Sequence, residues 1–409
     1  MPKDSKFPRV LCMRKQKTFR ERFFKCWRHK TVSQTPTNSE SSNTDLTSTT
    51  AWANLPQDIL DIVIHRLLLP DRIRLASVCT SWNSIARSNP LFFSAPQPPW
   101  LLLVNKLTLK TATFFNLSEN KIYKISQPDP PICNRTWCGS SSGWLVTMDV
   151  VSGLLLLNPL TGSQIQLPPL TTLPNLARPY RMAKVSWSSS HYTVMLALLS
   201  APYLAFTKEG DEAWTSLEGT RRIADLAVHN ERFYTLDLDG TVVAWDLNGP
   251  SPLVVSVILP GWLPSKISYG YLVGSSVGLL QVWRARDEMD FVVLELDLIS
   301  EEWIKVESLG DRALFLDLFC SLCVSSRDLA NLRGNCIYFT TGHLEKPRRE
   351  WGTRRFSFEN RSVESTTYNP QSHIWETWVF SLDGRTLEPI THPQSHWKQP
   401  PIWITPSWT

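Results

Sequence analysis

The sequence predicts a multidomain protein: a small all-α module near the amino end, followed by an all-β propeller. The first prediction depends on a segment of about 40 residues with apolar side chains at helical spacing. The second depends on a β-hairpin pattern that recurs through the rest of the chain. We therefore expect a helical domain at residues 52–95 and a propeller at residues 98–409, preceded by a disordered segment at residues 1–51.

The composition is that of a globular protein rich in aromatic residues. The 409 residues include 18 Trp against six Met, which favours β-structure over coiled coils. The chain has no apolar run long enough for a membrane span and no apolar leader near its first residue, so neither a transmembrane segment nor secretion is expected. Its eight Cys are too scattered for a disulfide framework.

The charge is concentrated at the amino end. Residues 1–30 hold eleven Lys or Arg against two acidic residues, a balance of +9, so the other residues sum to −4 within the total of +5. A mildly acidic body is not typical of a nucleic-acid-binding surface, and no nucleic-acid partner is expected. Residues 31–50 hold twelve Ser or Thr and no Lys or Arg, the composition of a disordered linker.

The basic segment at residues 13–30 interleaves Phe and Trp with Lys and Arg. Three interpretations stay open: a nuclear-localisation signal, an amphipathic helix for a membrane surface or organelle targeting, and a solvated tail. We expect the protein in the nucleus, the cytoplasm or both, with organellar targeting as the alternative.

The helical module has apolar residues on more than one face. One stripe at i, i+3, i+4 and i+7 consists of Leu60, Val63, Ile64 and Leu67. Ile59 and Ile62 lie off this stripe, and a second helix carries its own stripe of Leu75, Val78, Cys79, Trp82, Ile85 and Ala86. Pro70 is expected to end the first helix, and Asp71 to cap the second. A unit of this size rarely buries enough surface to stand alone, so the module predicts a protein partner.

The same residues carry a family resemblance. Leu55-Pro56, Ile59-Leu60, Leu67, Val78-Cys79 and Trp82 resemble the F-box, a motif that docks a Skp-type adaptor and, through it, a cullin. The resemblance implies adaptor binding by Leu55, Pro56, Ile59, Leu60, Ile64, Leu67, Val78, Cys79 and Trp82, through direct contact or internal packing. The alternative is an ordinary helical hairpin that belongs to the core of the downstream domain.

The second domain repeats a hairpin. In five copies, nine positions separate the turn-forming residue from an apolar residue of the next strand: 116 to 125, 158 to 167, 246 to 255, 297 to 306 and 381 to 390. A degenerate sixth copy runs from Phe206 to Leu217. Most copies start about 40–50 residues apart, the length of one four-stranded propeller blade. We predict six blades, with seven as the alternative.

Other strands complete the blades. Residues 144–147, 223–228, 271–273 and 337–340 are candidates for inner strands near the central channel. The tail at residues 400–408 is predicted to pair with the first blade, in which only three strands are visible.

This domain also resembles a known one. The segments that carry the resemblance are residues 139–146, 157–159, 166–168, 213–215, 337–339 and 401–403. They are similar to the DUF295-type, kelch-related β-propeller of plant F-box proteins. The resemblance implies the substrate receptor of an SCF-type ubiquitin ligase, a non-catalytic subunit whose propeller binds a protein substrate of unknown identity.

Motifs for chemistry are weak. Two G-x-S-x-G segments, centred on Ser141 and Ser276, lead into strand-like runs rather than helices, so we interpret them as turns of the repeat. Cys320 and Cys323 have C-x-x-C spacing, but their neighbours are apolar and no His pair is close in sequence. No cofactor, metal or enzymatic activity is expected.

An insertion at residues 343–373 is rich in Arg and aromatic residues, the types that dominate binding hot spots. It supplies the candidates for substrate binding: Arg348, Arg349, Trp351, Arg354, Arg355 and Phe356. A disordered or merely tolerated insertion is the alternative. For the whole protein, the alternatives to a ligase receptor are a non-degradative interaction scaffold and a propeller enzyme.

Overall fold

The computed structural model divides the chain into two compact units, Met1–Gln97 and Pro98–Thr409. It describes residues 55–67, 69–76, 78–89, 97–103, 111–126, 132–149, 153–160, 162–173, 183–188, 192–198, 202–217, 221–249, 251–259, 267–285, 290–297, 299–327, 329, 331–342, 355–356, 363–364, 375–390 and 399–407. The basic segment at residues 13–30 lies outside these ranges. Among the described residues, no helix combines the length and apolar character needed to cross a bilayer.

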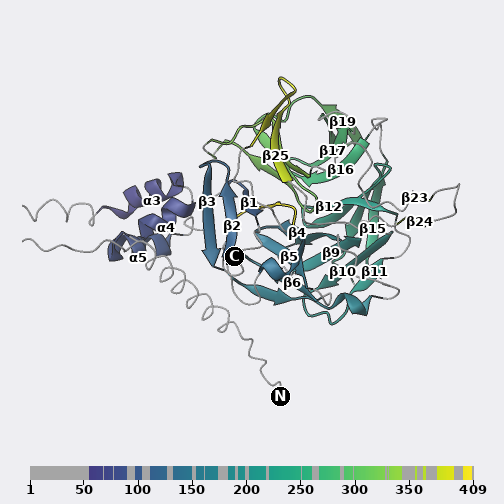
Figure 1. The fold of residues 1–409 in the computed structure, drawn as a ribbon, viewed down its shortest axis with the longest axis horizontal. Helices are drawn as coiled ribbons and strands as arrows, with labels where there is room; N and C mark the ends of the chain where they lie inside the picture. The colour runs from purple at the N-terminus through teal and green to yellow at the C-terminus, as the bar shows by residue number, and fades with distance from the viewer. Residues whose placement is uncertain are drawn as a thin grey trace, which may run out of the picture. The chain divides into compact units, whose positions relative to one another are not determined.

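The described part of the first unit contains three helices (Figure 1): α3 (Gln57–Arg66), α4 (Leu69–Ala76) and α5 (Thr80–Ser88). The prediction that Pro70 ends the first helix is wrong, because α3 stops at Arg66 and Pro70 is the second residue of α4. A first helical turn tolerates proline, since its missing N–H would have no partner there. Asp71 consequently lies in the first turn of α4 rather than capping it.

Polar side chains hold the three helices together. Arg72 is buried, and its Nε donates to the Ile64 carbonyl at 2.9 Å, which ties α4 to the end of α3. Asn83 Nδ2 donates to the Ala76 carbonyl at 2.6 Å and connects α5 to α4. Asn89, just after α5, donates to the Asp61 carboxylate on α3. The first two contacts give main-chain carbonyls near helix ends a side-chain donor, and the third joins two side chains.

The second unit is a β-propeller with six blades in its described part, as predicted (Figure 1). The strands are given from the first strand of each sheet outward. Blade 1 consists of β27 (Ile402–Ile404), β1 (Trp100–Leu103), β2 (Thr111–Asn116) and β3 (Lys121–Ser126), and blade 2 of β4 (Thr136–Ser141), β5 (Trp144–Met148), β6 (Leu154–Leu157) and β7 (Gln164–Gln166). Blade 3 consists of β8 (Ala183–Ser188), β9 (Thr193–Leu198), β10 (Tyr203–Lys208) and β11 (Thr215–Leu217).

Blades 4 to 6 follow the same plan, with a fifth strand in blade 6. Blade 4 consists of β12 (Ile223–His229), β13 (Arg232–Asp237), β14 (Val242–Asp246) and β15 (Leu253–Ile258), and blade 5 of β16 (Ile267–Gly274), β17 (Leu279–Ala285), β18 (Phe291–Asp297) and β19 (Glu302–Val306). Blade 6 consists of β21 (Ser321–Ser325), β20 (Arg312–Leu316), β22 (Cys336–Gly342), β25 (Trp375–Ser381) and β26 (Thr386–Pro389). Short 3-10 turns occur at Ile132–Asn134 and Leu170–Thr172, and β23 (Arg355–Phe356) pairs with β24 (Val363–Glu364).

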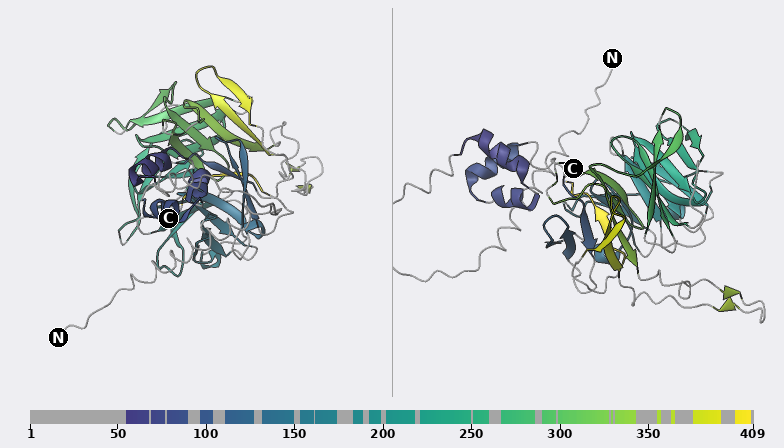
Figure 2. Two further views of the ribbon diagram at one scale, coloured as in Figure 1. Left: turned by 90° about the vertical axis from the view of Figure 1, so that its left-hand side faces the viewer. Right: turned by 90° about the horizontal axis from the view of Figure 1, so that it is seen from above.

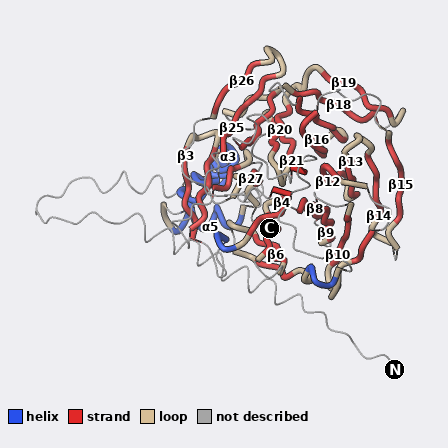
Figure 3. The backbone as a smooth tube through the Cα atoms, turned by 45° about the vertical axis from the view of Figure 1, so that its right-hand side comes forward, coloured by secondary structure: helices blue, strands red, loops and turns tan. Residues whose placement is uncertain are grey.

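The six repeated hairpins are the two outer strands of each blade, from β2–β3 to β25–β26. The first strands of neighbouring sheets contact one another around the centre, as Figure 3 shows for β4, β8, β12 and β16. Hydrophobic clusters fill the spaces between blades; one cluster joins Phe233 and Trp245 of blade 4 to Leu204 and Phe206 of blade 3. Each sheet therefore buries both faces of its inner strands.

The inner-strand candidates are only partly correct. β12 and β16 are the first strands of their sheets, but residues 144–147 form β5, a second strand. Residues 337–340 lie in β22, the third of five strands in blade 6. The reason is that β21 folds back on β20 and takes the inner place, so that β20 pairs in parallel with β22.

The tail closes the ring, as predicted. β27 pairs antiparallel with β1, with Trp100 opposite Ile404 and Leu101 opposite Trp403. The Trp403 amide donates to Asp317 Oδ2 of blade 6 at 2.7 Å, and its carbonyl accepts from Ser140 Oγ of blade 2 at 2.5 Å. One residue of the tail thus hydrogen-bonds to the two blades on either side of blade 1.

We predict that Trp403→Ala destabilises the propeller by about 3–5 kcal/mol, because a fully buried indole packed 4.9 Å from the Phe315 ring is lost. The measurement is the apparent free energy of unfolding of the full chain in denaturant, followed by circular dichroism. Ile304→Ala, at an exposed position of β19, is the control and should change it by less than about 0.5 kcal/mol. Equal effects of the two substitutions would contradict the proposed role of the tail.

Candidate functional site

The helical module leaves several apolar side chains in water. Ile59 and Ile62 on α3 are 45% and 54% exposed, and Val78, between α4 and α5, is 63% exposed. Val63 is also exposed, although its spacing placed it on the same stripe as the buried Leu60 and Ile64. Isolated exposed apolar residues are common, but four in one three-helix unit are typical of a surface that binds another protein.

The predicted adaptor-binding residues fall into two groups. Leu60 and Ile64 are buried in the core of the module with Leu75, Ala76 and Ala86, against which Leu55, Leu67 and Trp82 pack. Pro56, Ile59 and Val78 are exposed. Cys79 is half-buried, precedes α5, and its Sγ accepts from the Trp82 amide at 3.5 Å. The first group therefore supports the fold, and the second is available to a partner.

Two residues of this surface were absent from the predicted site: Ile62 and Val63. Ile62 could have been found, because its position off the buried stripe is visible in the sequence. Val63 could not, because it shares the helical spacing of the core residues. Only the packing of α3 against α5 shows which part of that stripe is covered.

The two G-x-S-x-G segments lie at hairpin turns, as predicted. In the first segment, Gly139 to Ser141 form the end of β4, and Ser142 and Gly143, at φ 49° and 84°, form the turn to β5. A Cβ at Gly143 would lie 2.2 Å from the Ser407 Cβ, so the tail passes directly over this turn. In the second segment, Ser275 Oγ donates to the Gly278 carbonyl at 2.8 Å and closes the turn between β16 and β17. Neither serine begins a helix, which a nucleophile elbow requires.

The C-x-x-C pair lies at the start of β21. Cys320 is buried, and its Sγ lies 3.5 Å from the Ser140 carbonyl of blade 2. Burial raises the pKa of the Cys323 thiol to about 11. Thiols with raised pKa values are poor nucleophiles and poor metal ligands at neutral pH. Within the described ranges, no three His, Cys, Asp or Glu side chains gather in a way that could hold a metal ion.

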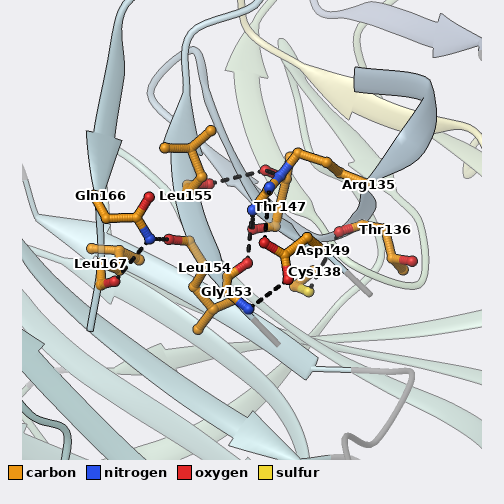
Figure 4. A network of polar contacts seen from close by, with 10 residues as sticks. All are labelled: Arg135, Thr136, Cys138, Thr147, Asp149, Gly153, Leu154, Leu155, Gln166 and Leu167. Carbon is orange, nitrogen blue, oxygen red and sulfur yellow. Dashed lines mark hydrogen bonds and ion pairs between the residues drawn. The ribbon is translucent and has the colours of Figure 1, made fainter. Parts of the chain in front are cut away.

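Blade 2 contains a buried guanidinium (Figure 4). Arg135 Nη2 donates to the carbonyls of Gly153 at 2.7 Å and Thr147 at 3.2 Å, and its Nε donates to Thr147 Oγ1 at 2.8 Å. Its Nη1 lies 3.4 Å from Asp149 Oδ2, and the same carboxylate accepts from the Gly153 amide at 2.7 Å. Because these donors are directed at the blade itself, the network stabilises the turn between β5 and β6.

The turn between β13 and β14 carries two carboxyl groups whose pKa values are shifted in opposite directions. Burial, and secondly the Asp239 carboxylate, raise the pKa of Asp237 to about 6, although Arg221 Nε lies 3.9 Å away. Burial acts in the same direction on Asp239, but hydrogen bonds from Thr241 and the Arg221 guanidinium outweigh it and lower the pKa of that carboxyl. A raised carboxyl pKa often marks a functional site, but here the cause is the packing of a tight turn.

The predicted substrate-binding residues lie mostly outside the described part of the chain. Arg348, Arg349, Trp351 and Arg354 are not described. Arg355 and Phe356 form β23, where they pair with Glu364 and Val363 of β24. Their assignment to substrate binding stays a prediction.

The helical module and the propeller each match a known domain, and together these matches define a class of protein, the F-box proteins with a propeller. The profile of the F-box domain matches residues 52–94, and that of the KIB1-4 beta-propeller matches residues 114–369, more than half of the chain. The chain belongs to this family of plant F-box proteins with a KIB1-4 β-propeller. An F-box domain implies binding of a Skp-type adaptor.

Similar curated proteins come from Arabidopsis thaliana. The putative F-box protein At4g17565 is 27% identical over 71% of this chain and 83% of its own length. The putative F-box protein At4g22170 is 24% identical over 87% of this chain and 98% of its own length. Among solved structures, a protein from Lactobacillus plantarum matches 72% of this chain and 81% of its own at 14% identity, with a TM-score of 0.37. A likeness of that size carries no information about function.

We predict that Leu60→Ala and Ile64→Ala destabilise the helical module by about 2–5 kcal/mol, because each removes a buried side chain from its small core. Hydrogen exchange of the α3 amides in the full chain measures this locally. The control is Ile62→Ala, a substitution at an exposed position of the same helix. It should change the free energy of opening measured by hydrogen exchange by less than about 0.5 kcal/mol from that of the native chain. Similar loss of protection in all three variants would show that the assignment of buried and exposed positions is wrong.

We also predict a pH-dependent gain of stability in Asp237→Asn. The pKa of Asp237 in the folded chain, about 6, exceeds the reference value of 3.8. This group therefore stabilises the folded chain fully at pH values below 3.8, and the contribution is lost as the pH rises through about 6. The asparagine variant should therefore melt higher than the native chain at pH 7, with the difference disappearing near pH 4.

Asp239→Asn is the matched control, since the lowered pKa of its carboxyl gives the opposite sign. It should melt lower than the native chain at pH 7. Melting temperatures of the three proteins across this pH range are the measurement. A difference for Asp237→Asn that does not change with pH would contradict the assignment.

Proposed function

We propose that this chain is the substrate-recognition subunit of an SCF-type ubiquitin ligase. The observation that carries the proposal is the set of exposed apolar residues on the F-box module: Ile59, Ile62, Val63 and Val78. Leaving them in water costs free energy at roughly 25 cal/mol for each Å² of apolar surface, and a bound adaptor would remove that cost. The propeller is the second binding element and holds the protein substrate.

The mechanism requires no bond chemistry from this chain. A receptor that holds a substrate lysine close to a carrier protein loaded with ubiquitin raises the effective concentration of that lysine at the carrier. Such a receptor needs a rigid body that keeps its bound substrate at a fixed place. Six blades closed by the pairing of β27 with β1 supply a rigid body of this kind.

The proposal predicts that Ile59→Asp combined with Ile62→Asp abolishes capture of a purified Skp-type adaptor by the full chain. Both side chains are exposed, so the substitutions introduce charge into the docking surface without disturbing the core of the module. Truncating well-buried anchors of an interface typically costs ~2 kcal/mol or more each, so the loss should exceed about 100-fold in affinity. Isothermal titration calorimetry measures it.

Leu238→Asp is the control, because Leu238 is an exposed apolar residue of a propeller turn. It should leave adaptor affinity unchanged. Recovery of a cullin together with the adaptor from plant cells, lost in the double variant, supports the ligase over a non-degradative scaffold. Unchanged adaptor binding by the double variant would overturn the assignment of the docking surface.

A further inference from the structure

Asp237 is a buried carboxyl group whose surroundings differ from those of the carboxylates near the centre of the ring. The residue is 4% exposed, and no hydrogen-bond donor in the part of the chain that the structure describes reaches its side chain. Asp317, by contrast, accepts from the amides of Phe319, Cys320 and Trp403. A buried carboxyl group without such donors favours its neutral, protonated form. Burial accordingly raises the pKa of Asp237 to about 6.

Two charged groups act on this carboxyl, and one guanidinium is shared between two acids. Arg221, in the segment before β12, places its Nε 3.9 Å from Asp237 Oδ2, while its Nη1 donates to Asp239 Oδ2 at 2.5 Å. Ile223 of β12, the partner of Asp237 in the sheet, carries no charge. Protonation of Asp237 leaves the guanidinium to Asp239 alone, whereas ionisation attracts it to both carboxylates.

The turn that carries Asp237 is hydrogen-bonded to the next blade. The Asp237 amide donates to the Thr241 carbonyl at 2.8 Å, and the Gly240 amide donates to the Asp237 carbonyl at 3.1 Å. The Gly240 carbonyl accepts from Nε2 of Gln281, on β17 of blade 5, at 2.9 Å. Oε1 of Gln281 accepts in turn from Nε1 of Trp283 at 3.0 Å. Consecutive hydrogen bonds therefore connect Asp237 of blade 4 to an indole of blade 5.

The far end of this connection is tightly packed. Gln281 and Trp283 are buried, and a Cβ at Gly270 would lie 2.3 Å from Cζ3 of Trp283, so the indole lies directly against the main chain of β16. β12 and β16, the first strands of blades 4 and 5, lie side by side, and Figure 2 shows the two blades next to each other in green. Because tightly packed side chains have few alternative positions, a small shift of the turn changes the environment of the indole.

We propose that this turn is a pH-sensitive contact between blades 4 and 5, in which the protonation state of Asp237 is transmitted through Gly240 and Gln281 to Trp283. At pH 7 the ionised form exceeds the protonated form about tenfold, and at pH 5 the ratio is reversed. The contact therefore changes between its two states within two pH units of mild acidification. Leu238, at the tip of the same turn, is 54% exposed, so the change extends to the surface of blade 4.

Fluorine NMR of the full chain labelled with 5-fluorotryptophan tests the proposal from about pH 5 to about pH 8. The Trp283 signal, identified by its loss in Trp283→Phe, should shift with a midpoint near pH 6 in the native chain. It should not titrate in Asp237→Asn, which keeps the shape of the side chain without the ionisable group. A shift caused by a histidine would persist in that variant. The Trp403 signal, from blade 1, is the control and should lack this midpoint.

Two surface variants should move the midpoint in opposite directions. Asp239→Asn removes a charge that raises the pKa of Asp237, so the midpoint should fall to lower pH. Arg221→Gln removes a charge that lowers this pKa, so the midpoint should rise. The side chains at positions 239 and 221 are 53% and 65% exposed, so both variants should keep the fold. They serve as the test even if Trp283→Phe fails to fold, because a single indole signal should follow both changes.

Gln281→Leu removes the side chain that connects the two blades, and the Trp283 signal of this variant should lose its titration. A native Trp283 signal that does not titrate near pH 6, a titration that persists in Asp237→Asn, or equal midpoints in the two surface variants would overturn the proposal. An unchanged titration in Gln281→Leu would also overturn it, because the indole would then respond through another route.

Discussion

The closing of the ring by its last strand is the constraint on which the propeller depends. Blades 2 to 5 are built from consecutive strands and blade 6 from strands between β20 and β26, but blade 1 takes its first strand from the other end of the chain. Without β27, the inner edge of β1 would face the centre unpaired, and the gap would separate blades 6 and 2. The bonds of Trp403 to Asp317 and Ser140 extend the closure to both neighbours. Closure of so long a loop costs little more entropy than closure of a medium one, because that cost rises only with the logarithm of length.

Buried polar groups near the centre fix the order of the blades. Asp225 of blade 4 accepts from the Leu272 amide of blade 5 at 2.9 Å and from Ser321 Oγ of blade 6 at 2.8 Å. Asp317 accepts from the amides of Phe319 and Cys320, both at 2.7 Å, as well as from the tail. A buried carboxylate is costly unless its oxygens are satisfied, so an arrangement of blades that broke these bonds would be strongly disfavoured. The carboxylates thus select one way of closing the ring.

The sequence predicts the outer hairpins better than the inner strands, for a physical reason. A hairpin such as β18–β19 is a local structure, and its turn residues and alternating pattern are visible within about a dozen residues. The inner place of β21 and the parallel pairing of β20 with β22 are set by contacts between distant strands. In the F-box module, helical spacing identified the core residues Leu60 and Ile64 but could not separate them from the exposed Val63. Periodicity defines a face, whereas exposure depends on where the neighbouring helix ends.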